Sequence, residues 1–163
     1  MMVRRALAVL TALWVALLPL PAGAAQWDTK HYHGSLCQPN NDEDDLYRWY
    51  TTGTRNKGES RFAHLICPIV RDNTTNTNGA LVRVTVREVD RGGWCSLHAM
   101  AWPDPSTVIS AWGAWEGGGI KIVELQLHSS FKHGHYSLWC TISEGSSVIS
   151  YWVAERLPSD ANN

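Results

Sequence analysis

The sequence has few charged residues for a chain of 163. Asp, Glu, Lys and Arg make up 18% of it, and the formal net charge is −1. Proteins that bind along the phosphate backbone of a nucleic acid need a stripe of Lys and Arg, and the sequence contains no such run. We therefore expect no nucleic acid partner.

The sequence also lacks the common catalytic motifs. It has no Gly-x-Ser-x-Gly, no His-Glu-x-x-His and no glycine-rich phosphate loop. A carboxylate pair such as Glu116 with Glu124 would suit glycoside hydrolysis, but any protein of this size contains such pairs. We expect a non-enzymatic protein without a cofactor, with a small extracytoplasmic enzyme as the alternative.

No two cysteines stand in a Cys-x-x-Cys motif, which argues against a zinc knuckle, a thioredoxin-type redox pair and haem attachment. The four cysteines are widely spaced, and an even number in an oxidising compartment favours disulfides. Four cysteines allow three pairings, and the spacing does not choose among them. We favour Cys37 with Cys67 and Cys95 with Cys140.

The first 25 residues have the order of an export signal. Two arginines, Arg4 and Arg5, precede an apolar run at 6–20 and a small-residue segment that fits cleavage after Ala25 or Ala24. We favour Ala25. The alternative, a retained N-terminal anchor, needs roughly 20 apolar residues to cross a bilayer. We expect a signal peptide at 1–25, one domain at 26–157 and a tail at 158–163, with no membrane span after cleavage.

Short stretches of period-two alternation recur after the signal peptide. Val82, Val84 and Val86 alternate with Arg83 and Arg87, as in a strand with one buried face. The same pattern puts Cys140 on an apolar face, where it suits a structural disulfide. We expect strands at 46–51, 62–70, 81–89, 94–102, 108–115, 120–128, 136–142 and 148–155, and at most a short helical turn at 42–48. This spacing predicts an all-β protein, an antiparallel β-sandwich of immunoglobulin-like or jelly-roll-like type with about 7–9 strands.

Six segments carry a resemblance that covers nearly the whole chain after the signal peptide. They are HGSLCQP at 33–39, CPIVRD at 67–72, VTV at 84–86, CSL at 95–97, YSLWC at 136–140 and ISYWVAE at 149–155. In their order and cysteine placement they resemble a group of uncharacterised small secreted bacterial β-domain proteins. The resemblance implies a bacterial origin and a disulfide-linked β-sandwich, and it implies no activity.

Histidines form two close pairs that suit metal binding. Residues two apart on a strand share a face, so His31 with His33, and His133 with His135, could each give two imidazoles to zinc or copper. The alternative is that the first pair lies in a flexible start and the second flanks a turn at Gly134. The acidic run at 42–45 invites a calcium interpretation, but it lacks the alternating ligands of an EF-hand, and a solvated loop is the better account.

Tryptophan is abundant, with nine residues in the chain. Trp102, Trp112 and Trp115 lie in or beside Gly- and Pro-containing segments, where an exposed ring can stack on a sugar. By parity, Trp139 and Trp152 point away from the apolar faces. The alternative to sugar binding is that Trp102, Trp112 and Trp115 fill the core or pack on the disulfides.

These observations predict a bacterial protein that is secreted or periplasmic and acts as a binding or surface-structural module. Its partner would be a protein or a glycan outside the cytoplasm. The sequence leaves two alternatives open: a histidine-dependent metal-binding protein or small extracytoplasmic enzyme, and a carbohydrate-binding module that uses exposed tryptophans.

Overall fold

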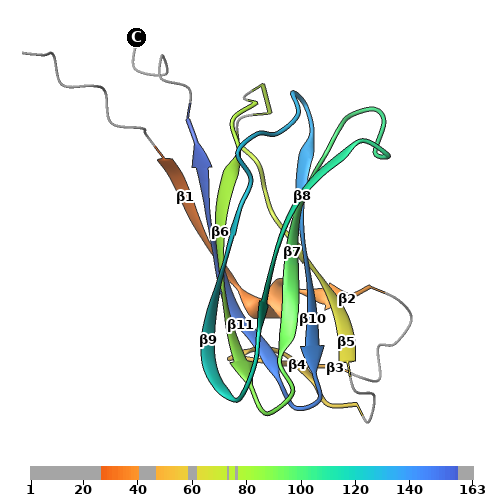
Figure 1. The fold of residues 1–163 in the computed structure, drawn as a ribbon, viewed down its shortest axis with the longest axis vertical. Helices are drawn as coiled ribbons and strands as arrows, with labels where there is room; N and C mark the ends of the chain where they lie inside the picture. The colour runs from red at the N-terminus through yellow and green to blue at the C-terminus, as the bar shows by residue number, and fades with distance from the viewer. Residues whose placement is uncertain (1–26, 41–46, 59–61, 73, 76, 158–163) are drawn as a thin grey trace, which may run out of the picture.

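The computed structural model describes residues 27–40, 47–58, 62–72, 74–75 and 77–157. These residues form two antiparallel sheets that face one another (Figure 1). The fold is therefore the all-β antiparallel sandwich that the alternation predicts. None of the described residues forms a helix with the length and apolar character needed to cross a bilayer.

The first sheet has six strands. Along it run β3 (Tyr47–Tyr50), β4 (Gly53–Asn56), β11 (Ser147–Arg156), β6 (Ala80–Glu88) and β9 (Gly119–Gln126). The sixth strand, β1 (Trp27–His33), also pairs with β11. It occupies the same edge of β11 as β4 but lies further along, because β4 pairs with residues 147–148 and β1 with residues 150–156.

The second sheet has five strands. In order they are β2 (Gln38–Pro39), β5 (Phe62–Pro68), β10 (His135–Ser143), β7 (Gly93–Met100) and β8 (Val108–Trp115). A single 3₁₀ turn, η1 (Gly34–Leu36), carries the chain from β1 in the first sheet to β2 in the second.

Alternation along the strands places the core between the two sheets. Val82, Val84 and Val86 of β6 are fully buried. Each buried valine stabilises the fold by about 1.5–3 kcal/mol relative to an exposed one. On β10, the residues predicted to face inward (Tyr136, Leu138, Cys140 and Ile142) are all buried.

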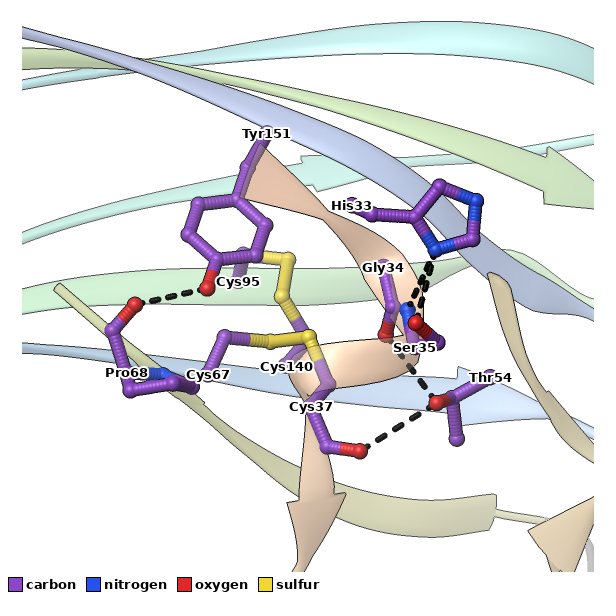
Figure 2. Close-up of a disulfide and its surroundings, with 10 residues drawn as sticks. All are labelled: His33, Gly34, Ser35, Cys37, Thr54, Cys67, Pro68, Cys95, Cys140 and Tyr151. Atoms are coloured by element: carbon purple, nitrogen blue, oxygen red, sulfur yellow. Dashed lines mark hydrogen bonds between the residues drawn. A yellow bond between two sulfur atoms is a disulfide. The ribbon is translucent and has the colours of Figure 1, made fainter. Parts of the chain in front are cut away.

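Both disulfides lie on the inner face of the five-stranded sheet. They join Cys37 to Cys67 and Cys95 to Cys140, the two pairs that we favour from the sequence. Cys95 and Cys140 are register partners on β7 and β10. Cys67 is the register partner of Leu138, two residues from Cys140 on β10, so the two bridges lie close together in the core (Figure 2).

The crossing between the sheets is closely packed. A Cβ atom on Gly34 would lie 2.1 Å from the carbonyl oxygen of Val148, which explains the need for glycine where η1 passes β11. The buried hydroxyl of Thr54 donates to the carbonyl oxygens of Gly34 (3.0 Å) and Cys37 (3.2 Å) (Figure 2). The phenol of Tyr151 donates to the carbonyl oxygen of Pro68 at 2.6 Å and links the two sheets. These contacts fix η1 beside the Cys37–Cys67 bridge.

The described residues contain eleven strands, more than the 7–9 expected from the sequence. The additional ones are β1, β2 and β4. The alternative of a flexible start at His31 and His33 is wrong, because β1 pairs with β11 along its whole length. The expected helical turn at 42–48 is wrong for Tyr47 and Arg48, which belong to β3, and its remainder lies outside the described residues.

Candidate functional site

Three tryptophans project from the outer face of the five-stranded sheet. Trp112 lies on β8, Trp94 on β7 and Trp139 on β10, and their exposed fractions are 76%, 40% and 36%. Most tryptophan side chains of globular proteins are largely buried, so three exposed rings on one face call for an explanation. We call this group the tryptophan platform.

The strand register fixes the spacing of the platform. Trp112 and Trp139 are both register partners of Ser96, so they lie in one row across the sheet with β7 between them. Two interstrand steps separate them, which is about 10 Å. Trp94 lies two residues before Ser96 on β7 and is therefore the diagonal neighbour of both, roughly 7–8 Å away.

Hydrogen-bonding side chains lie between the rings. The hydroxyl of Ser96 contacts Nε2 of His98 at 2.7 Å, and the indole of Trp139 donates to the hydroxyl of Ser137 at 2.6 Å. The His98 ring packs against Trp139, with 5.6 Å between ring centroids. Burial lowers the pKa of His98 and so favours the neutral form of its imidazole. The platform thus combines flat aromatic faces with neutral donors and acceptors.

The platform carries no formal charge. No Asp, Glu, Lys or Arg occupies an outward-facing position of β5, β7, β8 or β10. The outer face of the other sheet differs, because Arg83 and Glu124 form an ion pair there at 2.7 Å.

The Cys95–Cys140 bridge lies directly beneath the platform. Cys95 follows Trp94 on β7, and Cys140 follows Trp139 on β10, with the sulfur atoms on the inner face. Because successive residues of a strand point to opposite faces, the bridge holds in register the two strands that carry these rings.

Of the three tryptophans singled out from the sequence, two are exposed. Trp112 belongs to the platform, and Trp102 is exposed in the loop between β7 and β8. Trp115 is only 7% exposed, and its indole donates to Glu88 at 2.8 Å. Trp115 therefore offers no face to a ligand. The reason is parity, since Trp112 faces outward and the third residue after it must face inward.

Sequence reasoning singled out neither Trp94 nor Trp139 as a ligand residue. Parity alone already turns Trp139 outward, because it precedes the inward-facing Cys140. The same argument applies to Trp94, which precedes Cys95. The informative pattern was therefore an aromatic residue next to a disulfide cysteine in a strand.

The structure does not bring the two histidine pairs together. His31 and His33 lie on β1 in the six-stranded sheet, whereas His135 lies on β10 in the other sheet and His133 in the turn before it. Within the described part of the chain, no three His, Cys, Asp or Glu side chains are grouped to hold a metal ion. The two pairs therefore do not combine into one site with four histidine ligands. The acidic run at 42–45 lies outside the described residues.

Two glutamates have distinct environments. Glu124 of β9, considered above as half of a carboxylate pair with Glu116, ion-pairs instead with Arg83. Glu88, at the end of β6, is buried and accepts hydrogen bonds from the indole of Trp115 and the hydroxyls of Ser143 and Ser146. Burial raises the pKa of Glu88, but these hydrogen bonds outweigh it, so the pKa lies below its usual 4.5.

We expect Glu88→Gln to lower the free energy of unfolding at pH 7 by about 2 kcal/mol, because an amide cannot accept from all these buried donors. The Glu88 pKa is lower in the folded than in the unfolded protein. Its stabilising effect is therefore present above pH 4.5 and is lost as the pH falls through the folded-state value. Urea unfolding at pH 7 and pH 3 should show the deficit shrinking at the lower pH. Glu124→Gln, at the exposed ion pair, should change stability by less than about 1 kcal/mol. A deficit equal at both pH values would contradict this role for the carboxylate.

Comparison with known proteins finds no matching family model and no matching curated protein. Solved structures that resemble the chain include a family 29 carbohydrate-binding module from Piromyces equi (7% identity, 86% of this chain, 96% of that chain, TM-score 0.48). A second is the C-terminal CBM6 of the laminarinase LamC from Zobellia galactanivorans (12% identity, 77% of this chain, 98% of that chain, TM-score 0.45). A third is the CBM22-2 xylan-binding domain of Xyn10C from Paenibacillus barcinonensis (7% identity, 78% of this chain, 96% of that chain, TM-score 0.44). At these identities and TM-scores the likeness carries no conclusion about ligand or activity.

Proposed function

We propose that this protein binds a neutral polysaccharide on the tryptophan platform. The observation that carries the proposal is the row formed by Trp112 and Trp139 with Trp94 beside it, all exposed on one sheet face. Rigid aromatic rings provide a large contact area at a small cost in side-chain entropy. The C–H face of a sugar ring is a flat surface of matching size.

The exposure of the platform favours a ligand over a purely structural role. A contiguous apolar group at the surface of a soluble protein commonly marks an interaction site. Nothing in the described part of the chain covers Trp112, which is 76% exposed. A tryptophan that only fills the core would point to the inner face of its sheet. Trp115 does so, and its buried indole donates to Glu88.

The arrangement also favours a particular class of sugar. About 10 Å between Trp112 and Trp139 is more than one sugar ring covers, so the ligand is a chain laid across the strands. Since no charged side chain faces outward on these four strands, a neutral glycan fits better than an acidic one. His98 and the nearby hydroxyl groups supply neutral partners for sugar hydroxyls.

The proposal agrees with the expected location outside the cytoplasm. Two disulfides stabilise a chain in an oxidising compartment, and polysaccharides of cell walls and matrices are found there.

Affinity electrophoresis tests the proposal. The mature protein would be run through native gels that contain soluble xylan, galactomannan or mixed-linkage β-glucan, and mixed with insoluble cellulose. We expect retention by at least one of these glycans, accompanied by a change in tryptophan fluorescence. Unchanged mobility and fluorescence across the whole panel would contradict the proposal.

A further inference from the structure

A cavity lies on the side of the molecule opposite the platform, on the outer face of the six-stranded sheet. Its volume is about 560 Å³. It lies at the end of the sheet where β4 meets the start of β11, at the lower end of the sheet in Figure 1. No platform residue lines it. It is large enough for a ligand of one sugar or amino acid in size.

Two arginines line this cavity from either side of one serine. Arg55 of β4 and Arg87 of β6 are both register partners of Ser147 on β11. Long side chains on alternate strands of one face can converge over the residue between them. The two guanidinium groups and the serine hydroxyl are therefore placed to bind a single group.

Neither arginine has a carboxylate partner within the described part of the chain. Arg55 and Arg87 form no ion pair or side-chain hydrogen bond there with Asp or Glu. Arg83 lies on the same face of β6, four residues before Arg87 and outside the cavity. It forms an ion pair with Glu124 at 2.7 Å. The nearest buried carboxylate, Glu88, is directed to the interior and held by Trp115 and two serines. The described residues thus leave the positive charge of the cavity without a neutralising carboxylate.

Apart from Thr52, the other side chains of the lining are apolar. Ile120, the register partner of Arg87, is 70% exposed, and Ile149 of β11 also lines the cavity. Gly53, Gly119 and Gly145 contribute no side chains to the rim. An arginine fork matches the planar oxygens of a carboxylate or sulfate, and the isoleucines offer a surface for an organic body.

We propose that this cavity binds a small organic anion. Its carboxylate or sulfate group lies between Arg55 and Arg87 near Ser147, and its body rests on Ile120 and Ile149. The site is separate from the tryptophan platform and does not depend on it.

Calorimetry at low ionic strength tests this site with three probes: glucuronate, its neutral counterpart glucose, and inorganic sulfate. We expect heat of binding with glucuronate, none with glucose, and weaker binding of sulfate, which lacks the organic body. Arg55→Gln and Arg87→Gln should each weaken glucuronate binding by about ten- to a hundred-fold. Arg55→Lys and Arg87→Lys should keep part of the affinity, because lysine retains the positive charge and lacks the planar guanidinium fork.

Arg83→Gln is the matched control, because it removes a cation from the same strand and face but outside the cavity. It should leave glucuronate binding within about two-fold of the unsubstituted protein. Trp112→Ala should also leave it unchanged, so that failure of one site is distinguishable from failure of the other. Absence of glucuronate binding would overturn the proposal, as would equal binding of sulfate and glucuronate, or an equal loss in Arg83→Gln and Arg87→Gln.

Discussion

Replacing Cys95 and Cys140 together with alanine is expected to lower the free energy of unfolding by about 4 kcal/mol. The bridge closes a loop with a sequence separation of 45 residues, so its loss restores much conformational freedom to the unfolded chain. Both sulfur atoms are buried, and alanine leaves a small void in their place. Denaturant unfolding of the double variant and of the unsubstituted protein, both with the Cys37–Cys67 bridge oxidised, would measure the difference in free energy of unfolding.

The same substitution should also weaken glycan binding, because the bridge holds β7 and β10 in register beneath Trp94 and Trp139. The double variant Cys37→Ala/Cys67→Ala is the control. It opens a loop with a separation of 30 residues and should cost a similar amount of stability. Its bridge joins the chain before β2 to β5, and neither of these segments carries a ring of the platform, so binding should be preserved. A loss of binding that is the same in both variants would show that the bridge does not position the platform.

Trp112→Ala is expected to reduce affinity for the retained polysaccharide by roughly thirty-fold, or about 2 kcal/mol. The ring has the most exposed face of the platform and no packing role in the core, so its removal should cost the ligand one stacking surface and leave the fold intact. Affinity electrophoresis would give the change in binding, and thermal unfolding would show an unchanged midpoint.

Trp152→Ala is the matched control for this prediction. Trp152 lies on the outer face of the other sheet, where it contacts Arg83 and His31. Its loss should leave polysaccharide binding unchanged. If the two variants lost affinity equally, or if Trp112→Ala bound as well as the unsubstituted protein, the platform would not be the binding surface.

Much of the fold could be predicted because one face of each long strand is apolar. The expected strand at 108–115 coincides with β8, and the other long strands differ from expectation by only a few residues at their ends. The sequence did not predict strands β1 and β4, because polar residues occupy most of their inward-facing positions and no apolar alternation marks them. In β1 these include Asp28 and Lys30, and Lys30 is satisfied by an ion pair with Asp72 at 2.7 Å. In β4, the buried amide of Asn56 donates to the carbonyl oxygen of Ile142.

The candidate site was predictable only in part. The sequence identified tryptophan as the residue type and Trp112 as one member, but proximity to glycine and proline was a poor guide to exposure. It selected Trp115, which parity turns into the core, and passed over Trp94. The cavity between Arg55 and Arg87 had no local signal, because the pairing of distant strands with β11 brings the two together.

The most direct test of the central claim is to follow the indole N–H resonances by NMR while an oligosaccharide of the retained glycan is added. The account predicts that the signals of Trp94, Trp112 and Trp139 shift with one common dissociation constant, while those of Trp115 and Trp152 stay in place. Shifts confined to Trp152, or no shift in any of the three platform signals at saturating ligand, would contradict it.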